Sequence, residues 1–204
     1  TVTNNVLEIP ETVTTVGANA FQNCTSIKRL YWYAVKLTSG GAGNMENPAF
    51  KGCTALSHVR IYAPAKNIPS YFCYKAGRSI VLLTFNGTPV VETIGDYAFY
   101  QHRIQTLTLP DTVKKVGRET FRNNNLLKSI TFGANTATVE KLCFSFCNSL
   151  KSVTIPGTVK TLSYYAFRGC AALETVVIEE GVEYIATYAF ANCTNLKKVY
   201  LSFG

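Results

Sequence analysis

The sequence has few charged side chains and no long apolar run, and each shortage excludes a class of protein. Charged residues make up 16% of the 204 residues and apolar residues 47%, a balance that excludes an intrinsically disordered chain. Apolar runs such as IVLL at residues 80–83 are far shorter than the ~18 residues of a membrane-spanning helix. The first residues, TVTNNVLEIP, lack a basic stretch followed by an apolar one, so no signal peptide is expected within this chain.

Acidic residues are also scarce. The 12 Asp and Glu side chains are outnumbered by 20 Lys and Arg side chains, which gives a formal charge of +8 and a pI near 9.1. This excess favours acidic partners, which include anionic glycans, acidic protein surfaces and nucleic acid.

Groups that carry chemistry are missing as well. The two histidines, His58 and His102, do not form a Ser-His-Asp or Cys-His arrangement with other residues, and there is no G-x-x-x-x-G-K phosphate loop. Cys143 and Cys147 form a C-x₃-C pair, but no second pair or nearby His completes a zinc site. The sequence therefore predicts a protein that is not an enzyme and that binds no cofactor or metal.

What the sequence does have is an internal repeat centred on phenylalanine. Successive repeats are offset by 29, 22, 27, 22, 23, 23 and 23 residues, and a period in this range is typical of a leucine-rich-repeat solenoid. Seven of the eight repeats also carry a small residue before the Phe, and the position three residues after the Phe, which we call the Cys slot, is Cys in five repeats. The positions of the Phe slot are Phe21, Phe50, Phe72, Phe99, Phe121, Phe144, Phe167 and Phe190.

Two segments of each repeat have a predictable conformation. Residues nine to eleven positions after the Phe alternate between apolar and polar, as in Val153-Thr154-Ile155, which predicts one half-buried strand per repeat in a parallel sheet. The G-x-x-A-F-x-x-C segment spaces its apolar residues as a single helical or 3₁₀ turn does. One repeat cannot bury its apolar face alone, so neighbouring repeats must stack.

The predicted fold class is thus a leucine-rich-repeat solenoid of about eight repeats of 22–29 residues. Its parallel β-sheet forms the concave face, with short turns and 3₁₀ or helical turns on the other side. Residues 1–204 form a single domain, with irregular repeats 1–3, insertions near 33–48 and 83–91, and regular repeats 4–8 from about 92. The register of repeat 3 stays open, because either Ile80 and Leu82 or Val81 and Leu83 can face the core.

The pattern I-G-x-x-A-F-x-x-C-x-x-L-x-x-V-x-I-P resembles the BspA-like leucine-rich repeats of bacterial and protist surface proteins. The resemblance covers essentially the whole chain and is weakest in repeats 2 and 3. It implies an extracellular or cell-surface location and a role in adhesion, because members of the family are implicated as adhesins for host extracellular-matrix proteins.

The seven cysteines are predicted to be core thiols rather than disulfide partners. Five of them fill the Cys slot, as small buried apolar residues do, whereas Lys75, His102 and Asn124 fill it in the remaining repeats. Cys73 is the exception, because its slot is polar in other repeats and is predicted to be exposed. The N-x-[ST] sequences at Asn23, Asn86 and Asn192 are explained in large part by the repeated turn.

Residues that point outward from the predicted strands are the candidate binding residues, because the concave sheet of a solenoid is its usual binding surface. In the middle repeats they are Ser and Thr, whereas the first repeats carry Tyr and Arg, which are enriched in binding hot spots. The proposed partner-binding residues, which we call the tyrosine–arginine cluster, are Arg29, Tyr31, Tyr33, His58, Arg60 and Tyr62.

A second basic feature is a column seven residues after the Phe. It contains Lys28, Lys128, Lys151 and Lys197, with Arg78 if repeat 3 keeps the same register. Two interpretations remain open: a basic stripe that binds a partner, or a solvated edge that keeps the strands soluble.

Three functions follow in decreasing order of support. The first is a binding module, extracellular or at the cell surface, that recognises a protein ligand such as a host extracellular-matrix protein, or an anionic glycan. The second is a structural spacer within a longer repeat array, with no ligand of its own. Nucleic-acid binding through basic residues is a distant third.

Overall fold

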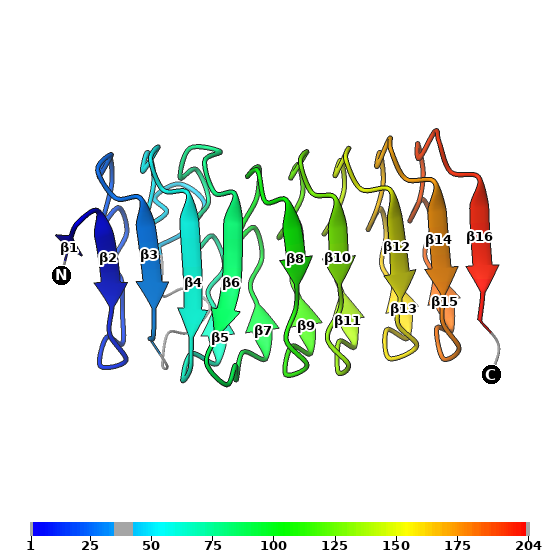
Figure 1. Cartoon of the computed structure of the whole chain (residues 1–204), viewed down its shortest axis with the longest axis horizontal. Coiled ribbons are helices and arrows are strands. Elements are labelled where there is room, and N and C mark those ends of the chain that lie inside the picture. Colours follow the sequence, from blue (N-terminus) through cyan, green and yellow to red (C-terminus); the bar gives the residue numbers. More distant parts are fainter. Residues whose placement is uncertain (1, 35–42, 203–204) are drawn as a thin grey trace.

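The computed structural model describes residues 2–34 and 43–202, and every regular element within them is a β-strand (Figure 1). The chain winds as a parallel β-solenoid in which each repeat contributes a long strand to one face. From repeat 3 on, a two-residue strand lies on the opposite face. No helix occurs in the described ranges, so the solenoid is built from strands and turns alone.

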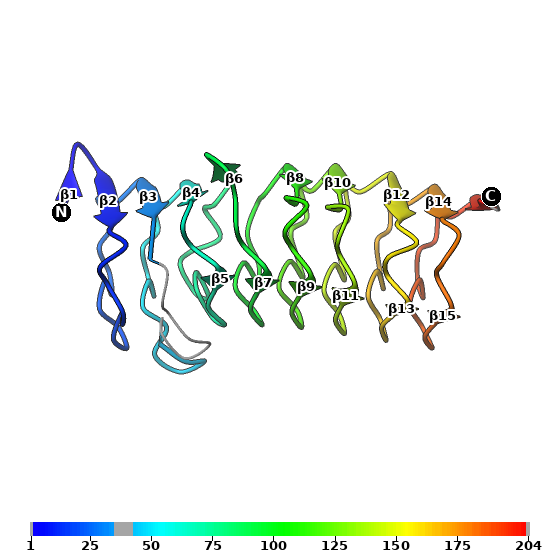
Figure 2. The same cartoon turned by 90° about the horizontal axis from the view of Figure 1, so that it is seen from below.

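The long strands form one face of the solenoid, which we call the long-strand face. This face shows little curvature when its strands are seen nearly end-on (Figure 2). They are β2 (Val6–Ile9), β3 (Arg29–Trp32), β4 (His58–Tyr62), β6 (Leu82–Asn86), β8 (Thr106–Thr108), β10 (Ser129–Thr131), β12 (Ser152–Ile155), β14 (Thr175–Ile178) and β16 (Lys198–Leu201).

The short strands form a six-stranded sheet on the opposite face. Each contains the apolar residue that comes shortly before the Phe slot, and that residue points inward in most of them. They are β5 (Asn67–Ile68), β7 (Thr93–Ile94), β9 (Lys115–Val116), β11 (Thr138–Val139), β13 (Thr161–Leu162) and β15 (Tyr184–Ile185).

Strand pairing between repeats is parallel, as the sequence predicted. The exception among the described strands is β1 (Val2–Thr3), which pairs antiparallel with β2 through a tight turn. Asn4 and Asn5 in this turn both have positive φ, which a two-residue type I′ hairpin requires. The long-strand face itself is interrupted, because no ladder joins β6 to β8 or β10 to β12. The predicted solenoid of about eight stacked repeats is confirmed.

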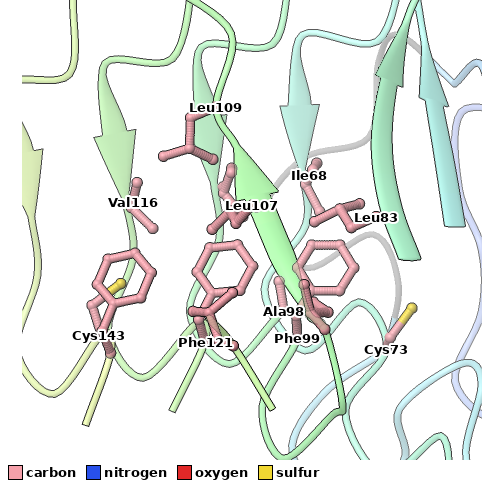
Figure 3. Packing of buried hydrophobic residues seen from close by; sticks show 14 of the residues in the cluster. Ile68, Cys73, Leu83, Ala98, Phe99, Leu107, Leu109, Val116, Phe121 and Cys143 are labelled. Atoms are coloured by element: carbon pink, nitrogen blue, oxygen red, sulfur yellow. The ribbon is translucent and has the colours of Figure 1, made fainter. Parts of the chain in front are cut away.

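The core is a continuous row of phenylalanine rings between the two faces (Figure 3). Centroids of neighbouring rings lie 5.2–5.9 Å apart from Phe21 to Phe190, and most pairs are stacked within 12° of parallel. Phe72 alone meets both of its neighbours edge-to-face, at 74° and 78°. The interior row of rings that the Phe period implies is therefore present, with one irregular member in repeat 3.

The segment around each Phe forms consecutive turns rather than a helix. In repeat 1, the Ala20 and Cys24 amides donate to carbonyls three residues earlier, as in a 3₁₀ turn. Asn19 and Asn23, however, have positive φ, and a left-handed residue on each side of Phe21 prevents the turns from continuing as a helix. The Phe21 amide donates instead to the Ala49 carbonyl of the next repeat, at 2.9 Å. This left-handed conformation also explains Asn at 23 and 192, two of the three N-x-[ST] positions.

Most side chains in the Cys slot donate a hydrogen bond to a backbone carbonyl, although apolar residues surround them. In five repeats the Cys-slot side chain donates to the Phe-slot carbonyl of the preceding repeat, and Asn124 does so to Phe99 at 2.9 Å. The cysteines that make this bond, at 3.0–3.5 Å, are Cys53, Cys147, Cys170 and Cys193. All seven cysteines are free, and the predicted core position of the Cys-slot thiols is confirmed except at Cys24, which is half-buried.

The prediction that Cys73 is exposed is wrong, because its side chain is fully buried. Left-handed Tyr71 and Lys75 lie two positions before and two positions after Cys73, so Cys73 occupies the backbone position that Phe holds elsewhere. His102 confirms this offset, since its Nε2 bonds the Cys73 carbonyl at 2.9 Å. The one-residue shift also moves Lys75 out of the Cys slot onto the surface and places buried Ala76 there.

The register of repeat 3 is resolved by the pairing of β6 with β4. Leu83 pairs with Val59 and faces the core, whereas Leu82 points outward and Ile80 is buried ahead of the strand. Residues 83–86 of the segment predicted as an insertion near 83–91 thus belong to strand β6, and the extra length follows Asn86. Of the insertion near 33–48, residues 35–42 lie outside the described part of the chain.

Candidate functional site

The tyrosine–arginine cluster lies on two adjacent long strands. β3 and β4 pair in parallel with Arg29 opposite His58 and Tyr31 opposite Arg60. Residues 30 and 32 of β3 and 59 and 61 of β4 are buried, so the alternate residues point outward. Tyr33 directly follows β3 and continues the same alternation, and its amide donates to the Ile9 carbonyl at 2.9 Å.

Four of the six cluster residues contact one another. The Tyr33 and Tyr62 rings stack with centroids 4.5 Å apart, and Tyr31 meets Tyr62 edge-to-face at 5.8 Å. The Arg60 guanidinium lies over the Tyr31 ring, 5.3 Å from its centroid. Arg29 and His58 lie beside this group through the strand register, and His58 Nδ1 is 2.8 Å from Ser57 Oγ. The structure therefore brings three tyrosines and one arginine into a single half-exposed contact group.

Local burial and charge set the protonation of this group. Burial raises the pKa of Tyr33, with smaller contributions from Tyr62 and from the carboxylate of Glu8. A hydrogen bond with the Tyr62 side chain raises the pKa of Arg60. At neutral pH the Tyr33 phenol therefore remains protonated and Arg60 remains cationic. The group offers hydrogen-bond donors, a positive charge and flat apolar rings, which suits a protein surface that presents carboxylates beside apolar side chains.

The structure adds a groove that the sequence did not predict. It has a volume of about 350 Å³ and lies where the long-strand face is interrupted between β6 and β8. Its lining includes outward-facing Leu82 and Thr84, and Thr84 pairs with Arg60 of the cluster. The residues that line the groove are Leu82, Leu83, Thr84, Phe85, Pro89, Thr106, Thr108 and Pro110. A signal was present in the repeat lengths, since repeat 4 is shorter than repeat 3 between its Phe and its strand.

Beyond this groove the long-strand face carries small polar side chains. Thr108, Thr131 and Thr154 are exposed at matching positions of β8, β10 and β12. They make no aromatic or cationic group comparable with that on β3 and β4. The face is thus polarised along its length, with the tyrosine–arginine cluster at one end.

The lysine column does not form a continuous basic stripe. Arg78 lies outside it, because Val81 takes the position immediately after the buried Ile80 in repeat 3. In repeat 7 the column carries Glu174, which pairs with Lys197 at 3.8 Å. Charges of both signs on an exposed edge agree with the solvated-edge interpretation.

Burial sets the protonation of several enclosed thiols and of the buried histidine, whereas a hydrogen bond with the Cys170 side chain lowers the pKa of Cys193. Burial raises the pKa of Cys53 to about 11 and that of Cys147 to about 12, so both thiols stay protonated at neutral pH. Burial lowers the pKa of His102 to about 4, which keeps its imidazole neutral. Across residues 2–34 and 43–202, His, Cys, Asp and Glu side chains form no group of three that could hold a metal ion.

The same ranges contain no helix with the length and apolarity of a membrane span.

Comparison with known proteins places this architecture. The model of the BspA type leucine-rich repeat region matches residues 2–126 and 92–203, with six copies of the repeat. No curated protein is a significant match to the sequence.

Solved structures of similar fold are leucine-rich-repeat proteins. The leucine-rich-repeat protein TpLRR of T. pallidum is 17% identical with a TM-score of 0.66, and the match covers 96% of this chain and 86% of TpLRR. The pneumococcal vaccine antigen PcpA is 21% identical with a TM-score of 0.60, and the match covers 89% of this chain and 47% of PcpA. A leucine-rich cell-surface protein of Faecalibacterium prausnitzii is 20% identical with a TM-score of 0.44, over 98% of this chain and 79% of that protein.

At these identities the structures of TpLRR and PcpA support the fold alone, and the family model supports the family. Its two matched ranges together cover almost the whole chain. The chain belongs to the BspA-type leucine-rich repeat family.

Proposed function

We propose that this chain is a non-enzymatic recognition module that binds another protein through the tyrosine–arginine cluster, outside the cell or at its surface. The observation that carries the proposal is the contact group of Tyr31, Tyr33, Arg60 and Tyr62 on the outward side of β3 and β4. Tyrosines and arginines that contact one another in the free protein lose little side-chain entropy on binding, which favours affinity.

Membership of the BspA-type family supports the binding role and suggests the surface location. The resemblance to adhesins favours an extracellular-matrix protein as the partner. The groove between β6 and β8 extends the available contact area beyond the cluster, because Thr84 lines the groove and is the strand partner of Arg60.

The test compares two variants on the same face. Replacement of Arg29, Tyr31, Arg60 and Tyr62 by Ala is expected to weaken binding to immobilised fibronectin, laminin or collagen by more than tenfold, because hot-spot residues of these types dominate interfaces. Replacement of Thr108, Thr131 and Thr154 by Ala serves as the control and is expected to leave binding within twofold. Surface plasmon resonance at physiological salt measures both, and equal losses in the two variants would contradict the proposal.

The second candidate function is a structural spacer with no ligand of its own. The uniform Ser and Thr side chains of β8, β10 and β12 favour it for that part of the molecule, since they offer few groups with hot-spot character. Absence of binding to every matrix protein in the same experiment would favour the spacer. Nucleic-acid binding predicts a steep decrease of affinity with salt, which a titration with single-stranded and duplex DNA measures directly.

A further inference from the structure

Repeats 3 and 4 differ in length at the corner where the chain passes from the Cys slot to the long strand. We measure this corner from the buried residue of the Cys slot to the next buried residue. The spacing is three positions in repeat 2 (Cys53 to Leu56), four in repeat 3 (Ala76 to Ile80) and two in repeat 4 (His102 to Ile104). The long corner therefore projects beside a short one, at the edge of the solenoid where strands β6 and β8 begin (Figure 1).

Other parts of the structure accommodate this mismatch. The Ile104 amide, displaced by the short corner, donates to Asn124 Oδ1 at 3.2 Å. In the long corner Gly77 has a φ of +96°, and a Cβ at this position would lie 2.9 Å from the Thr54 Cα. Residue 77 must therefore be glycine for the corner to fit against repeat 2.

Two adjoining hollows result, with volumes of about 220 and 500 Å³. They share four lining residues, Gly77, Arg78, Gln101 and His102, so we treat them as one site and call it the corner site.

The charge of the corner site is positive throughout. Lys75, Arg78 and Arg103 line it and are exposed, and none of its lining residues is acidic. Arg78 and Arg103 form no ion pair with any carboxylate in the described part of the chain, whereas Lys75 Nζ donates to the Met45 carbonyl at 3.3 Å. Two free guanidinium groups facing a hollow suit a ligand with several anionic oxygens.

The remaining lining includes polar and aromatic side chains beside Ala76, Gly77 and Leu126. The amides of Gln101, Asn123 and Asn125 supply both donors and acceptors, which sugar hydroxyls require. The rings of Tyr74 and Tyr100, 5.5 Å apart, form one wall. Each of these rings already packs against the Tyr97 ring, and a cation also lies near each: Lys75 at Tyr74 and Arg122 at Tyr100. A sugar ring and a nucleic-acid base would both use these ring faces, so the amide groups, which match sugar hydroxyls, are the feature that favours a sugar.

We propose that the corner site binds a sulfated oligosaccharide. Arg78 and Arg103 hold sulfate groups, the amides hold hydroxyl groups, and the tyrosine wall contacts the apolar side of a sugar ring. The site lies at the edge of the solenoid rather than on the outward side of β3 and β4, so it is separate from the tyrosine–arginine cluster. It gives the molecule a second ligand class, independent of a protein partner.

Isothermal titration with a heparin hexasaccharide tests the proposal on the whole chain. The double variant Arg78→Ala/Arg103→Ala is expected to lose at least tenfold in affinity at 100 mM salt, because two charge-assisted contacts are removed. The matched control is Lys141→Ala/Lys151→Ala, which removes two exposed charges from repeat 6, outside the corner site, and is expected to change affinity by less than threefold. Thermal unfolding of each variant verifies that the fold is intact.

Several outcomes overturn the proposal. Equal losses in the two double variants would show that net charge alone attracts the oligosaccharide. Binding of a single-stranded DNA of matched charge with equal affinity, or absence of hexasaccharide binding to the unmodified chain, would also overturn it. The four-residue alanine variant of the tyrosine–arginine cluster must retain hexasaccharide binding, so failure of the recognition proposal and failure of this one are distinguishable.

Discussion

The first and the middle repeats of the long-strand face have the same backbone and different surfaces. β3 and β4 alternate buried and outward residues in the same register as β8, β10 and β12. Inward positions are Leu, Val, Ile or Trp in both regions, whereas outward positions are Tyr, Arg and His in one and Ser and Thr in the other. Because the outward residues of the strands are not part of the core, they are free to differ between repeats, and a binding site can arise without a change of fold.

The largest effect is expected from a substitution in the interior row of phenylalanine rings, which both regions share. Phe121→Ala removes one ring from the middle of the interior row, where it lies between Phe99 and Phe144 with centroids 5.6 and 5.4 Å away. The cavity and the lost transfer energy are expected to reduce the free energy of unfolding by about 3–5 kcal/mol. Urea denaturation followed by circular dichroism measures the loss. The control Thr131→Ala, on the outward side of the neighbouring strand, is expected to cost less than about 0.5 kcal/mol.

The boundary between the two regions contains His102, which predicts a pH dependence of stability. Burial lowers the pKa of His102 from 6.5 to about 4, so between these values the unfolded chain binds more protons than the folded one. Stability is therefore complete above about pH 6.5 and falls as the pH is lowered toward 4, by about 3 kcal/mol in total.

His102→Asn places in repeat 4 the residue that repeat 5 carries in the same slot at Asn124, and it is expected to remove this slope. Thermal unfolding between pH 7 and 4.5 compares the two proteins. A slope that persists in the variant would assign the pH dependence to other groups.

A single substitution at Tyr62 tests whether the tyrosine–arginine cluster of the first repeats binds a protein. Tyr62 contacts both Tyr31 and Tyr33, so Tyr62→Ala is expected to disorganise the cluster and to weaken protein binding by about 2 kcal/mol, roughly thirtyfold. Surface plasmon resonance with the matrix protein identified for the unmodified chain measures the change. Tyr62→Phe keeps the ring and is the control. An unchanged affinity of Tyr62→Ala would place the contact surface elsewhere on the molecule.

The smallest effect is expected when the middle region is made to resemble the first. Thr131→Tyr adds an aromatic ring at an exposed outward position of β10, where strands tolerate such residues. The free energy of unfolding is expected to change by less than about 0.5 kcal/mol, as measured by urea denaturation. A decrease of the free energy of unfolding by more than about 2 kcal/mol would show that the outward positions contribute to the stability of the solenoid.

The period of the sequence predicted the stacked repeats and their inward residues, because most repeats have nearly equal lengths. From Phe121 to Phe190 each offset is 23 residues, and the predicted inward residues of β12, Val153 and Ile155, are buried. Repeat 3 could not be aligned in the same way, because of its one-residue shift. Cys73 takes the backbone position that Phe holds in other repeats, and Phe72 takes the position before it. The distance from Ile68 to Cys73 equals that from Ile94 to Phe99, and this is the signal that identifies the shift.

The proximity of the candidate binding residues was predictable, and their contacts were not. Parallel strands in register place Tyr31 next to Arg60, which follows from the repeat alone. The stacking of Tyr33 on Tyr62 depends on rotamers that no sequence pattern determines. The short-strand sheet was missed because two residues are too few to show an alternating pattern.

The bonds from the Cys-slot thiols to the carbonyls of the preceding repeat make each sulfur a marker of one boundary between repeats. Such a thiol becomes accessible to an alkylating reagent only when the repeat before it separates, and these cysteines are distributed from repeat 2 to repeat 8. Mass spectrometry after a short labelling pulse would then report which boundary opens first, without the introduction of any foreign probe.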